Sequence, residues 1–362
     1  MADSPYPELK KRHTMAHTGR PWTDHKPPSA APVWAAVEGL ARYHSLVAAL
    51  ELDVFDVLAD VGPAEVTPLA TKLDVDEANL GALLDALVVQ GFLEQIRDVY
   101  DLNDTARRYL CSEGAATMVD LIPVAPGPAE NWTRLADTVR NGRPATPVDG
   151  DGVDPAEFYV PLVEGTFTTI HRAATRADLR IGYSRLRAPK VLDLGAGGAP
   201  WSIAILEGCP DATAVVNDWP GVLTVAEAKT AAHGVSERVQ FRPGDYHEIE
   251  IEPGAYDIVV LGHVCRTEGP RAAALVARAF GALKPGGRLI LADYFADNGR
   301  KLNPHAVIMG LTMAASTVEG GPLTARGVHS WLHEAGFEAI RMIEPIGFQF
   351  AYVATRPGAV DS

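Results

Sequence analysis

Apolar residues in the first third of the chain recur at the spacing of an α-helix. Residues 35–59 and 66–75 follow this pattern, and residues 76–90 follow it most regularly. In that third segment, one apolar face holds Leu80, Leu83, Leu84, Leu87 and Val88. The pattern therefore predicts three helices, the third of them with a well-defined buried face.

The ends of the third predicted helix carry capping and turn signals. Asp76 can accept a hydrogen bond from the first backbone amides of the helix, and Gly91 suits the turn that ends it. Residues 92–102 then alternate around Arg97 and Asp98, which predicts a small β-hairpin. Three helices and a two-stranded wing together predict a winged helix over residues 32–111.

A winged helix raises the question of DNA binding, because in DNA-binding examples one helix reads the major groove. The third predicted helix carries Asp76, Glu77 and Asp85 but no Lys or Arg, and the whole chain has a net charge of −14. Phosphate backbones would repel such a surface. We therefore expect this domain to mediate dimerisation and not to bind nucleic acid.

Beyond this domain, a mainly helical section over residues 112–186 leads into alternating strand and helix patterns. Apolar runs predict strands at residues 190–195, 213–218, 239–245, 256–262 and 287–294. The helical segments between them indicate a Rossmann-like, doubly wound and mostly parallel sheet over residues 187–362. Two further runs, at residues 338–347 and 348–357, predict an antiparallel C-terminal hairpin. The fold class is thus α/β with an added N-terminal, mainly helical domain.

Two acidic or histidine-rich segments could suggest metal binding. The loop at residues 146–155 contains Asp149, Asp151 and Asp154, but no Glu stands at the closing position of an EF-hand, so we expect a solvated turn. Residues 1–31 contain His13, His17 and His25, which could bind a metal ion. A flexible, solvated tail is the favoured interpretation.

Composition narrows the cellular setting. The 362 residues suit two domains, and the three cysteines are too widely spaced for a disulfide framework or a CxxC metal site. No apolar run approaches the roughly 20 residues that span a bilayer, and the N-terminal residues lack the apolar core of a signal peptide. We expect a cytoplasmic protein with no membrane partner.

The stretch VLDLGAGGAP, residues 191–200, marks a ligand site at the carboxyl end of the first predicted strand. Gly195 and Gly197 match the first two glycines of a dinucleotide fingerprint, but Pro200 occupies the place of the third and has no N–H for a phosphate. Asp193 would repel a pyrophosphate and attract a cationic amino group. The turn therefore indicates a ligand with a positive end and no phosphates.

The next two strands add acidic residues at the same edge of the sheet. Asp218 ends the second strand, where a carboxylate can accept both hydroxyls of a ribose. Asp245 and Tyr246 follow the third strand and could take an adenine amino group and flank its ring. Each acid alone could be a turn or helix cap, but acids after three successive strands favour an adenosine-type ligand.

The ordered motifs DLGAGG, NDWP, GDYH, YDIVVLGHV and LKPGGRLILAD resemble those of class I S-adenosylmethionine-dependent methyltransferases. With the winged helix and the segment ENWTRLADTVRNGRP, the chain is similar to the small-molecule O-methyltransferases of plant and bacterial secondary metabolism. The resemblance covers the chain from about residue 33 to its end. It implies a homodimer formed through the first domain, whose N-terminal helices help to wall the partner's pocket.

The resemblance also implies S-adenosylmethionine as the cofactor and a set of residues that hold it. These are Asp193, Gly195, Gly197, Asp218, Trp219, Asp245, Tyr246 and Gly262. Within this set, Asp193 and the first two glycines would lie around the methionine part, Asp218 would bind the ribose, and Asp245 with Tyr246 would lie near the adenine.

The chain departs from this family after the fourth strand. Relatives carry a general-base His there, usually in a His-Asp-Trp run, whereas LGHVCRTEG places Arg266 at that position. Arginine cannot accept a proton at ordinary pH, so it would hold a substrate carboxylate in a bidentate pair or form a surface salt bridge. The candidate catalytic residues are Arg266, His263, Glu268, Glu319 and His305.

The other candidates offer alternatives to the missing base. His263 and Glu268 could accept a proton, and Glu319 lies near the position where the family often has a Glu that steadies the catalytic His. His263 and His305 also raise a metal option, because relatives that methylate α-keto acids use a histidine-held metal. Two histidines 42 residues apart are weak evidence, and pocket-lining roles are favoured.

We therefore expect S-adenosylmethionine-dependent methylation of a small, aromatic natural-product metabolite, with O-methylation favoured. Because Arg266 occupies the base position, C-methylation of an aromatic ring or α-keto acid, with or without a metal, is the alternative. A homologue that binds the cofactor without methylating, or a winged-helix regulator, is a second alternative.

Overall fold

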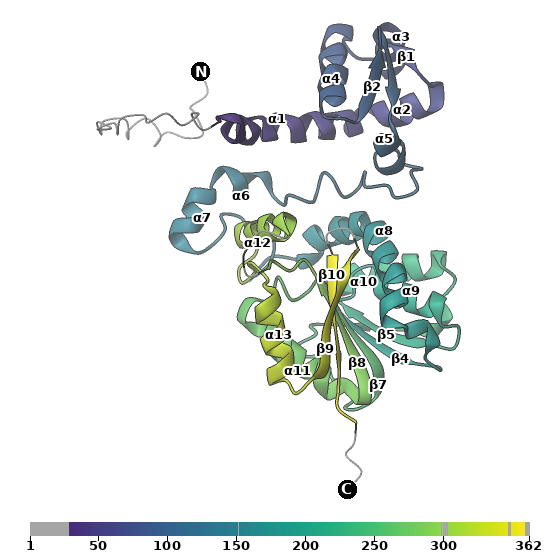
Figure 1. The fold of residues 1–362 in the computed structure, drawn as a ribbon, viewed down its shortest axis with the longest axis vertical. Helices are drawn as coiled ribbons and strands as arrows, with labels where there is room; N and C mark the ends of the chain where they lie inside the picture. The colour runs from purple at the N-terminus through teal and green to yellow at the C-terminus, as the bar shows by residue number, and fades with distance from the viewer. Residues whose placement is uncertain (1–28, 151, 298, 300–302, 347–348, 359–362) are drawn as a thin grey trace, which may run out of the picture. The chain divides into compact units, whose positions relative to one another are not determined.

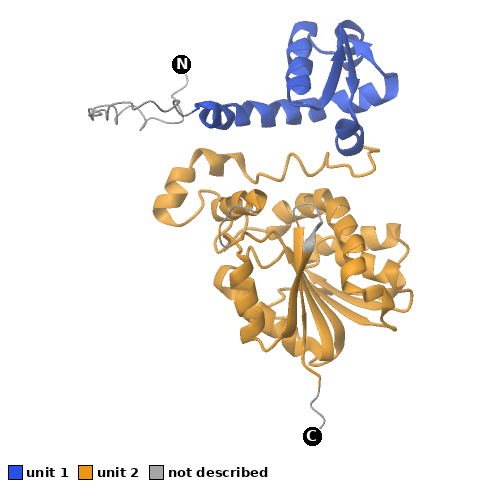
Figure 2. Ribbon diagram, in the orientation of Figure 1, with its two compact units in different colours: residues 1–111 blue, residues 112–362 orange. Residues whose placement is uncertain are grey.

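A computed structural model describes residues 29–150, 152–297, 299, 303–346 and 349–358. The three histidines of the N-terminal tail and Asp151 lie outside the described residues. The chain divides into two compact units, Met1–Cys111 and Ser112–Ser362 (Figure 2).

The first unit contains helices packed with a small sheet. Its elements are α1 (Ala31–Glu51), α2 (Val54–Val61), β1 (Ala64–Glu65), α3 (Val66–Leu73), α4 (Glu77–Val89), β2 (Leu93–Ile96), β3 (Val99–Leu102) and α5 (Asp104–Tyr109) (Figure 1). The helical pattern at residues 35–59 belongs to two helices, because Asp53 adopts a left-handed φ of 54° that an uninterrupted helix does not allow. The predicted hairpin is present as β2 and β3. Strand β1 pairs with β3, so this sheet has three strands.

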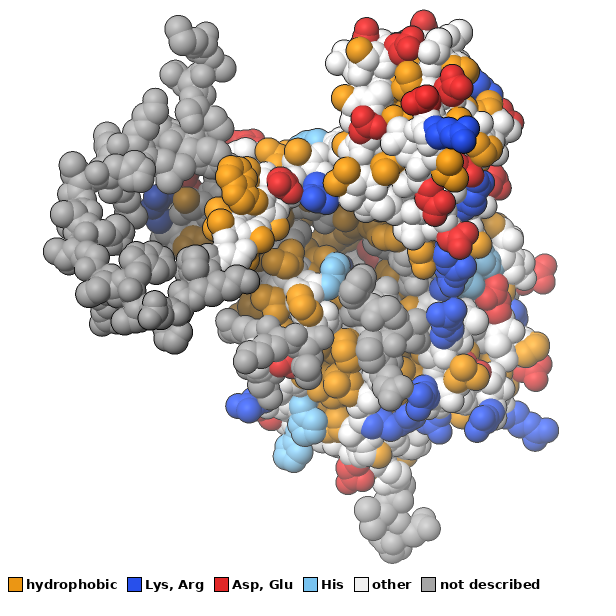
Figure 3. Space-filling model, turned by 45° about the horizontal axis from the view of Figure 1, so that its top comes forward, with side chains coloured by type: hydrophobic (Ala, Val, Ile, Leu, Met, Phe, Trp, Pro, Cys, Tyr) orange, Lys and Arg blue, Asp and Glu red, His pale blue; other side chains and the backbone are white. Residues whose placement is uncertain are grey.

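Helix α4 has the buried face and the cap that its sequence predicts. Leu80, Leu84 and Leu87 are buried, and Asp76 Oδ1 accepts a 2.9 Å hydrogen bond from the amide of Asn79. Asp76 and Glu77 are exposed, and Figure 3 shows acidic side chains scattered over this unit on the face in view. The outer surface of α4 is therefore acidic where a DNA-reading helix would be basic.

The second unit is built on a seven-stranded sheet in the order β6-β5-β4-β7-β8-β10-β9. The strands are β4 (Lys190–Leu194), β5 (Thr213–Asp218), β6 (Val239–Pro243), β7 (Tyr256–Gly262), β8 (Leu283–Asp293), β9 (Glu338–Ile346) and β10 (Gln349–Thr355). Strands β4 to β8 form the parallel part of the sheet, while β10 runs antiparallel to both β8 and β9. This is the predicted α/β fold with its antiparallel C-terminal hairpin.

Helices cover both faces of this sheet, and the strands alternate between two apolar cores (Figure 1). The helices are α6 (Ala129–Thr133), α7 (Leu135–Asn141), α8 (Pro155–Ile181), α9 (Pro200–Gly208), α10 (Pro220–Ala232), α11 (Ala272–Ala282), α12 (Pro304–Ser316) and α13 (Ala325–Glu334). Helices α8, α9 and α10 pack with Val191 and Val216 on one face, and α11 and α13 pack with Leu192 and Val215 on the other. The order of strands reverses at β4, where an open α/β sheet forms its ligand crevice.

The section before the sheet is less helical than its sequence pattern indicates, since residues 112–128 form turns. The expectation of a solvated turn at residues 146–155 holds only in part, because Gly150, Gly152 and Asp154 are exposed but Val148 is not. Val148 is buried and its amide donates to the carbonyl of Ser316, while Asp149 Oδ1 accepts from the amide of Val318 at 2.8 Å. Short-range composition did not reveal that this loop packs onto the segment after α12. In the described part of the chain, no helix is long and apolar enough to cross a membrane.

Candidate active site

A cavity of about 970 Å³ opens at the carboxyl ends of β4, β5 and β7, within the second unit. Twelve of the thirteen predicted site residues line it. They are Asp193, Gly195, Gly197, Asp218, Trp219, Asp245, Tyr246, Gly262, His263, Arg266, Glu268 and Glu319. The parallel sheet brings these distant segments together because its strands all end at this edge.

The turn between β4 and α9 requires glycine at two positions. Gly195 and Gly197 have left-handed φ values of 64° and 59°. A Cβ at residue 195 would collide with Val264 and lie 3.2 Å from the ring of Tyr246, and one at residue 197 would lie 3.0 Å from Val163. Backbone conformation and space therefore both exclude larger residues from this wall of the cavity.

Asp193 provides a buried carboxyl group beneath the turn. Its side chain is 1% exposed and accepts a 2.7 Å hydrogen bond from the hydroxyl of Ser202. Burial raises the pKa of Asp193 to about 7, against the opposing effect of the Ser202 hydrogen bonds. A cationic group in the cavity would stabilise the charged form of this carboxyl group.

Asp218 links the turn to the end of the next strand. Its two oxygens accept hydrogen bonds from the amides of Gly197 at 2.7 Å and Trp219 at 2.8 Å. Burial raises its pKa, although the two amide hydrogen bonds oppose the rise. Each carboxylate oxygen retains a second lone pair for a ligand hydroxyl.

Glu268 joins the loops that follow β6 and β7. It accepts hydrogen bonds from the Tyr246 hydroxyl at 2.5 Å and from His247 Nε2 at 2.6 Å, and Arg271 Nε lies 3.3 Å from it. With three partners, Glu268 is poorly placed to act as a free base. Its contacts instead fix Tyr246, whose ring lies beside Gly195.

Arg266 forms a buried ion pair, so the interpretation as a surface salt bridge was wrong. Its Nη1 donates to Asp293 Oδ1 at 3.0 Å, and Asp293 is fully buried at the end of β8. Burial opposes the charge on Asp293, but Arg266 and His263 hold the pKa of Asp293 below its ordinary value. Arg266 Nε is buried without a hydrogen-bond partner in the described structure. Arg266 also lines the cavity.

His263 occupies the position three residues before Arg266 in a left-handed conformation, with a φ of 65°. Its side chain is 7% exposed, and Nδ1 lies 3.6 Å from Asp293 Oδ1, beyond hydrogen-bond distance. Neither ring nitrogen has a hydrogen-bond partner among the described residues. His263 is therefore a buried imidazole that lines the cavity, with Nδ1 on the side of Asp293.

His305 and Glu319 lie at the margin of this arrangement. His305 does not line the cavity but packs edge-on against Tyr294, which also contacts His263. The described residues place neither histidine in a group of three or more side chains that could share a metal ion. Glu319 lines the cavity but is exposed, with its carbonyl close to Gly269.

Sequence reasoning missed Asp149, Tyr159, Trp201 and Tyr294, which also line the cavity. Burial raises the pKa of both Asp149 and Tyr159, and Trp201 Nε1 is buried without a partner in the described structure. Tyr294 follows directly after Asp293 at the end of β8, a position that the strand pattern could have indicated. No local signal marks Asp149 or Tyr159, because loop packing places them.

Two family models match the chain: an O-methyltransferase domain over residues 167–338 and an O-methyltransferase dimerisation domain over residues 34–112. The chain belongs to this O-methyltransferase family. This methyltransferase is 26% identical over 318 residues to 3-hydroxy-5-methyl-1-naphthoate 3-O-methyltransferase of Streptomyces sahachiroi, covering 84% of the chain and 88% of the relative.

A second relative is named for methylation of a carbon atom and not of an oxygen atom. The methyltransferase is 32% identical over 155 residues to L-tyrosine C(3)-methyltransferase of Streptomyces lavendulae, which covers 41% of each chain. The fold of the present chain is similar to that of human N-acetylserotonin methyltransferase in complex with SAM, with a TM-score of 0.77 and 21% identity. The match covers 93% of this chain and 100% of the other.

Proposed function

We propose that this methyltransferase transfers the methyl group of S-adenosylmethionine to a hydroxyl group of a small aromatic acid. The observation that carries the proposal is the pair of buried aspartates, Asp193 and Asp218, beside the glycine turn of Gly195 and Gly197 at one edge of the sheet. Membership of the O-methyltransferase family supports methyl transfer. The relative that acts on a hydroxynaphthoate supports an aromatic acceptor with a carboxylate.

The residues at the cavity fit the chemistry of this cofactor. The buried Asp193 carboxyl suits an amino-acid ammonium group, and the glycine turn leaves space that a Cβ would fill. Asp218 keeps acceptor capacity for ribose hydroxyls, while Trp219, Asp245, Tyr246 and Gly262 line the remaining wall. When bound, S-adenosylmethionine supplies a methyl group on a positively charged sulfur. The net negative charge of these residues favours such a ligand.

The raised pKa of Asp193 predicts how cofactor affinity depends on pH. The folded pKa of Asp193, about 7, lies above the ordinary value of 3.8, because burial favours the protonated carboxyl group. The stability that this protonation contributes to the fold is therefore fully present below pH 3.8 and is lost as pH rises through about 7. A cationic ligand prefers the charged carboxylate. We expect affinity to increase as pH rises towards about 7, by up to about tenfold per unit, and then level off.

Calorimetric titrations between about pH 5.5 and 8.5 measure this dependence, and binding in buffers of different ionisation enthalpy counts the released proton. Asp193→Asn is the matched variant, since it keeps the shape without the titration. An identical pH dependence in that variant would assign the effect to another group.

Arg266 and His263 are proposed to act on the acceptor. Arg266 has donors beyond its bond to Asp293, and a guanidinium can hold a carboxylate or stabilise a phenolate. His263 is proposed to receive the hydroxyl proton, because it lines the cavity beside the Asp293 carboxylate, which would stabilise the resulting imidazolium. Glu268, Glu319 and His305 are proposed to position these groups or the loops around them.

C-methylation of an aromatic ring remains the second candidate, because Arg266 replaces the expected base and one relative methylates a carbon of tyrosine. Incubation with hydroxylated aromatic acids and [methyl-¹³C]S-adenosylmethionine separates the two. We expect the label in a methoxy group, whose ¹³C chemical shift in NMR is that of a carbon bonded to oxygen. A label bonded directly to a ring carbon would establish the alternative.

We further propose a homodimer formed through the first unit. The match to a dimerisation domain supports it, as does an exposed apolar row on α1 that contains Val33, Trp34, Val37 and Leu40. The three cysteines are buried and free, which suits a cytoplasmic location. Sedimentation equilibrium should give twice the chain mass, and a monomer at micromolar concentration would contradict this proposal.

A further inference from the structure

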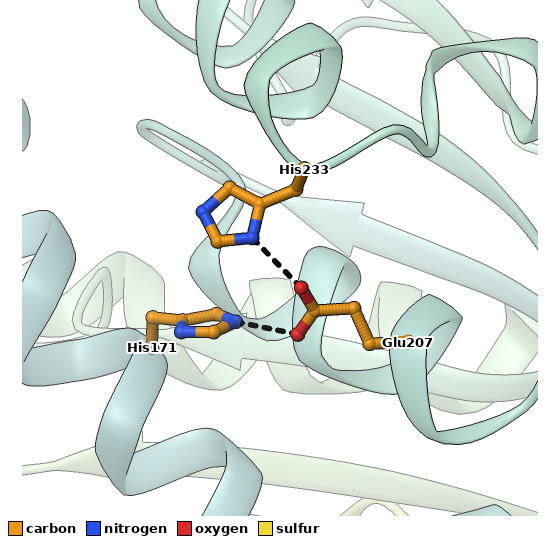
Figure 4. Close-up of side chains that lie close together, drawn as sticks. All are labelled: His171, Glu207 and His233. Carbon is orange, nitrogen blue, oxygen red and sulfur yellow. Dashed lines mark hydrogen bonds and ion pairs between the residues drawn. The ribbon is translucent and has the colours of Figure 1, made fainter.

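A second cluster of potential ligand groups lies outside the cavity lining. His171 on α8, Glu207 on α9 and His233 directly after α10 converge with their side chains pointing at one another (Figure 4). His171 Nε2 lies 2.9 Å from one carboxylate oxygen of Glu207, and His233 Nδ1 lies 2.7 Å from the other. None of these three residues lines the cavity or takes part in the proposed methyl transfer.

We propose that His171, Glu207 and His233 bind a divalent transition-metal ion of the zinc class. Two imidazoles and a carboxylate are a donor set that such ions prefer, and three protein ligands leave one position for water. The ligand atoms lie within 4.8 Å of one another, and tetrahedral coordination brings ligands to about 3.4 Å. Small side-chain rotations therefore close the site around an ion.

Access and local charge are compatible with this ion. The side chains are 18%, 37% and 27% exposed for His171, Glu207 and His233, so an ion can enter from solvent and retain a water ligand. Lys229 lies one turn before His233, and its ammonium group is 4.9 Å above the ring of Phe167. The ammonium group of Lys229 is thus directed at the face of the Phe167 ring. The carboxylate of Glu207 instead contacts the two histidines.

The site is connected to the glycine turn through Phe167. The rings of His171 and Phe167 stack with centroids 5.5 Å apart, and His233 lies 5.4 Å from the same ring. Phe167 also lies beside Gly198, a residue that lines the cavity: a Cβ added at Gly198 would be 3.2 Å from the Phe167 ring. An ion joining α8, α9 and α10 would thus steady the packing directly behind the cofactor turn.

Cobalt titration of the metal-stripped full-length chain tests the proposal. All measurements use a background with His13→Gln, His17→Gln and His25→Gln, because these tail imidazoles could also bind metal. We expect one Co²⁺ per chain with visible absorption bands, displacement by Zn²⁺, and a higher melting temperature with Zn²⁺. The three cysteines are buried, so near-ultraviolet thiolate bands should not accompany binding.

Matched variants locate the ion. His233→Gln and Glu207→Gln should each weaken Co²⁺ binding more than about tenfold and remove the Zn²⁺-dependent shift in melting temperature. His329→Gln, which changes an exposed histidine on α13, should leave both unchanged. Circular dichroism establishes that each variant is folded.

Two results would overturn the proposal: no Co²⁺ binding by the folded background protein, or binding that survives both cluster substitutions. Because the readouts are absorbance and melting temperature, they are independent of methyl transfer. Failure of the metal site would therefore leave the proposed activity untouched, and the reverse also holds.

Discussion

Gly195→Ala should reduce S-adenosylmethionine affinity by at least about a hundredfold while leaving the chain folded. Left-handed backbone costs a non-glycine residue roughly 1–2 kcal/mol. The new methyl group would also collide with Val264 and crowd the Tyr246 ring, so the turn or the cavity wall must shift. A displaced turn would misplace the amide of Gly197, which donates to Asp218. Calorimetric titration with the cofactor measures the loss.

Gly254→Ala is the matched control for this prediction. Gly254 has a φ of 62°, close to the 64° of Gly195, but the nearest atom to its added Cβ would be 4.0 Å away. The two variants share the backbone strain and differ in the collision and in their distance from the cavity. We expect similar affinity to wild type in the control. Unchanged affinity in Gly195→Ala would show that the turn does not hold the ligand.

Arg266→Met should lower the free energy of unfolding by about 3–5 kcal/mol, because it leaves the carboxylate of Asp293 buried and unpaired. Adding Asp293→Asn should restore much of the loss, since an amide oxygen can still accept from the amide of Tyr294 without carrying charge. Chemical denaturation of both single variants and the double variant gives the coupling energy directly.

Arg140→Met is the corresponding exposed-pair control. Arg140 lies 2.8 Å from Asp137, and its side chain is 63% exposed. Removing this surface pair should change the free energy of unfolding by less than about 1 kcal/mol. Equal effects at Arg140 and Arg266, or no coupling between residues 266 and 293, would refute the structural role assigned to the buried pair.

The positions of Asp193, Asp218 and the glycine turn in one cavity were largely predictable from the sequence. Strand patterns place Asp193 and Asp218 at strand ends, and parallel pairing then requires these ends to lie at one edge of the sheet. The spacing of Gly195 and Gly197, together with Pro200, indicated a ligand-binding turn that does not hold a phosphate. This inference needed no knowledge of the residues that pack against the turn. Local pattern and global fold agree here, which is why local reasoning succeeded.

The surroundings of Arg266 and Asp149 were much less predictable, because their side-chain partners come from distant segments. Arg266 pairs with Asp293, 27 residues away, through the register that aligns Gly262 with Ala292. Asp149 reaches the cavity because its loop bonds to Val318, 169 residues later in the chain. No periodicity in either segment indicates such contacts, so the surface salt bridge was wrong and the solvated turn held only in part.

The most direct test of the central claim is calorimetric titration of S-adenosylmethionine into the wild type and Asp218→Ala, with exposed Asp211→Ala as the control. We expect one site per chain in the wild type and in the control. We expect more than tenfold weaker binding, above about 1.4 kcal/mol, in Asp218→Ala. No binding to the wild type, or equal binding to a folded Asp218→Ala, would contradict the central claim.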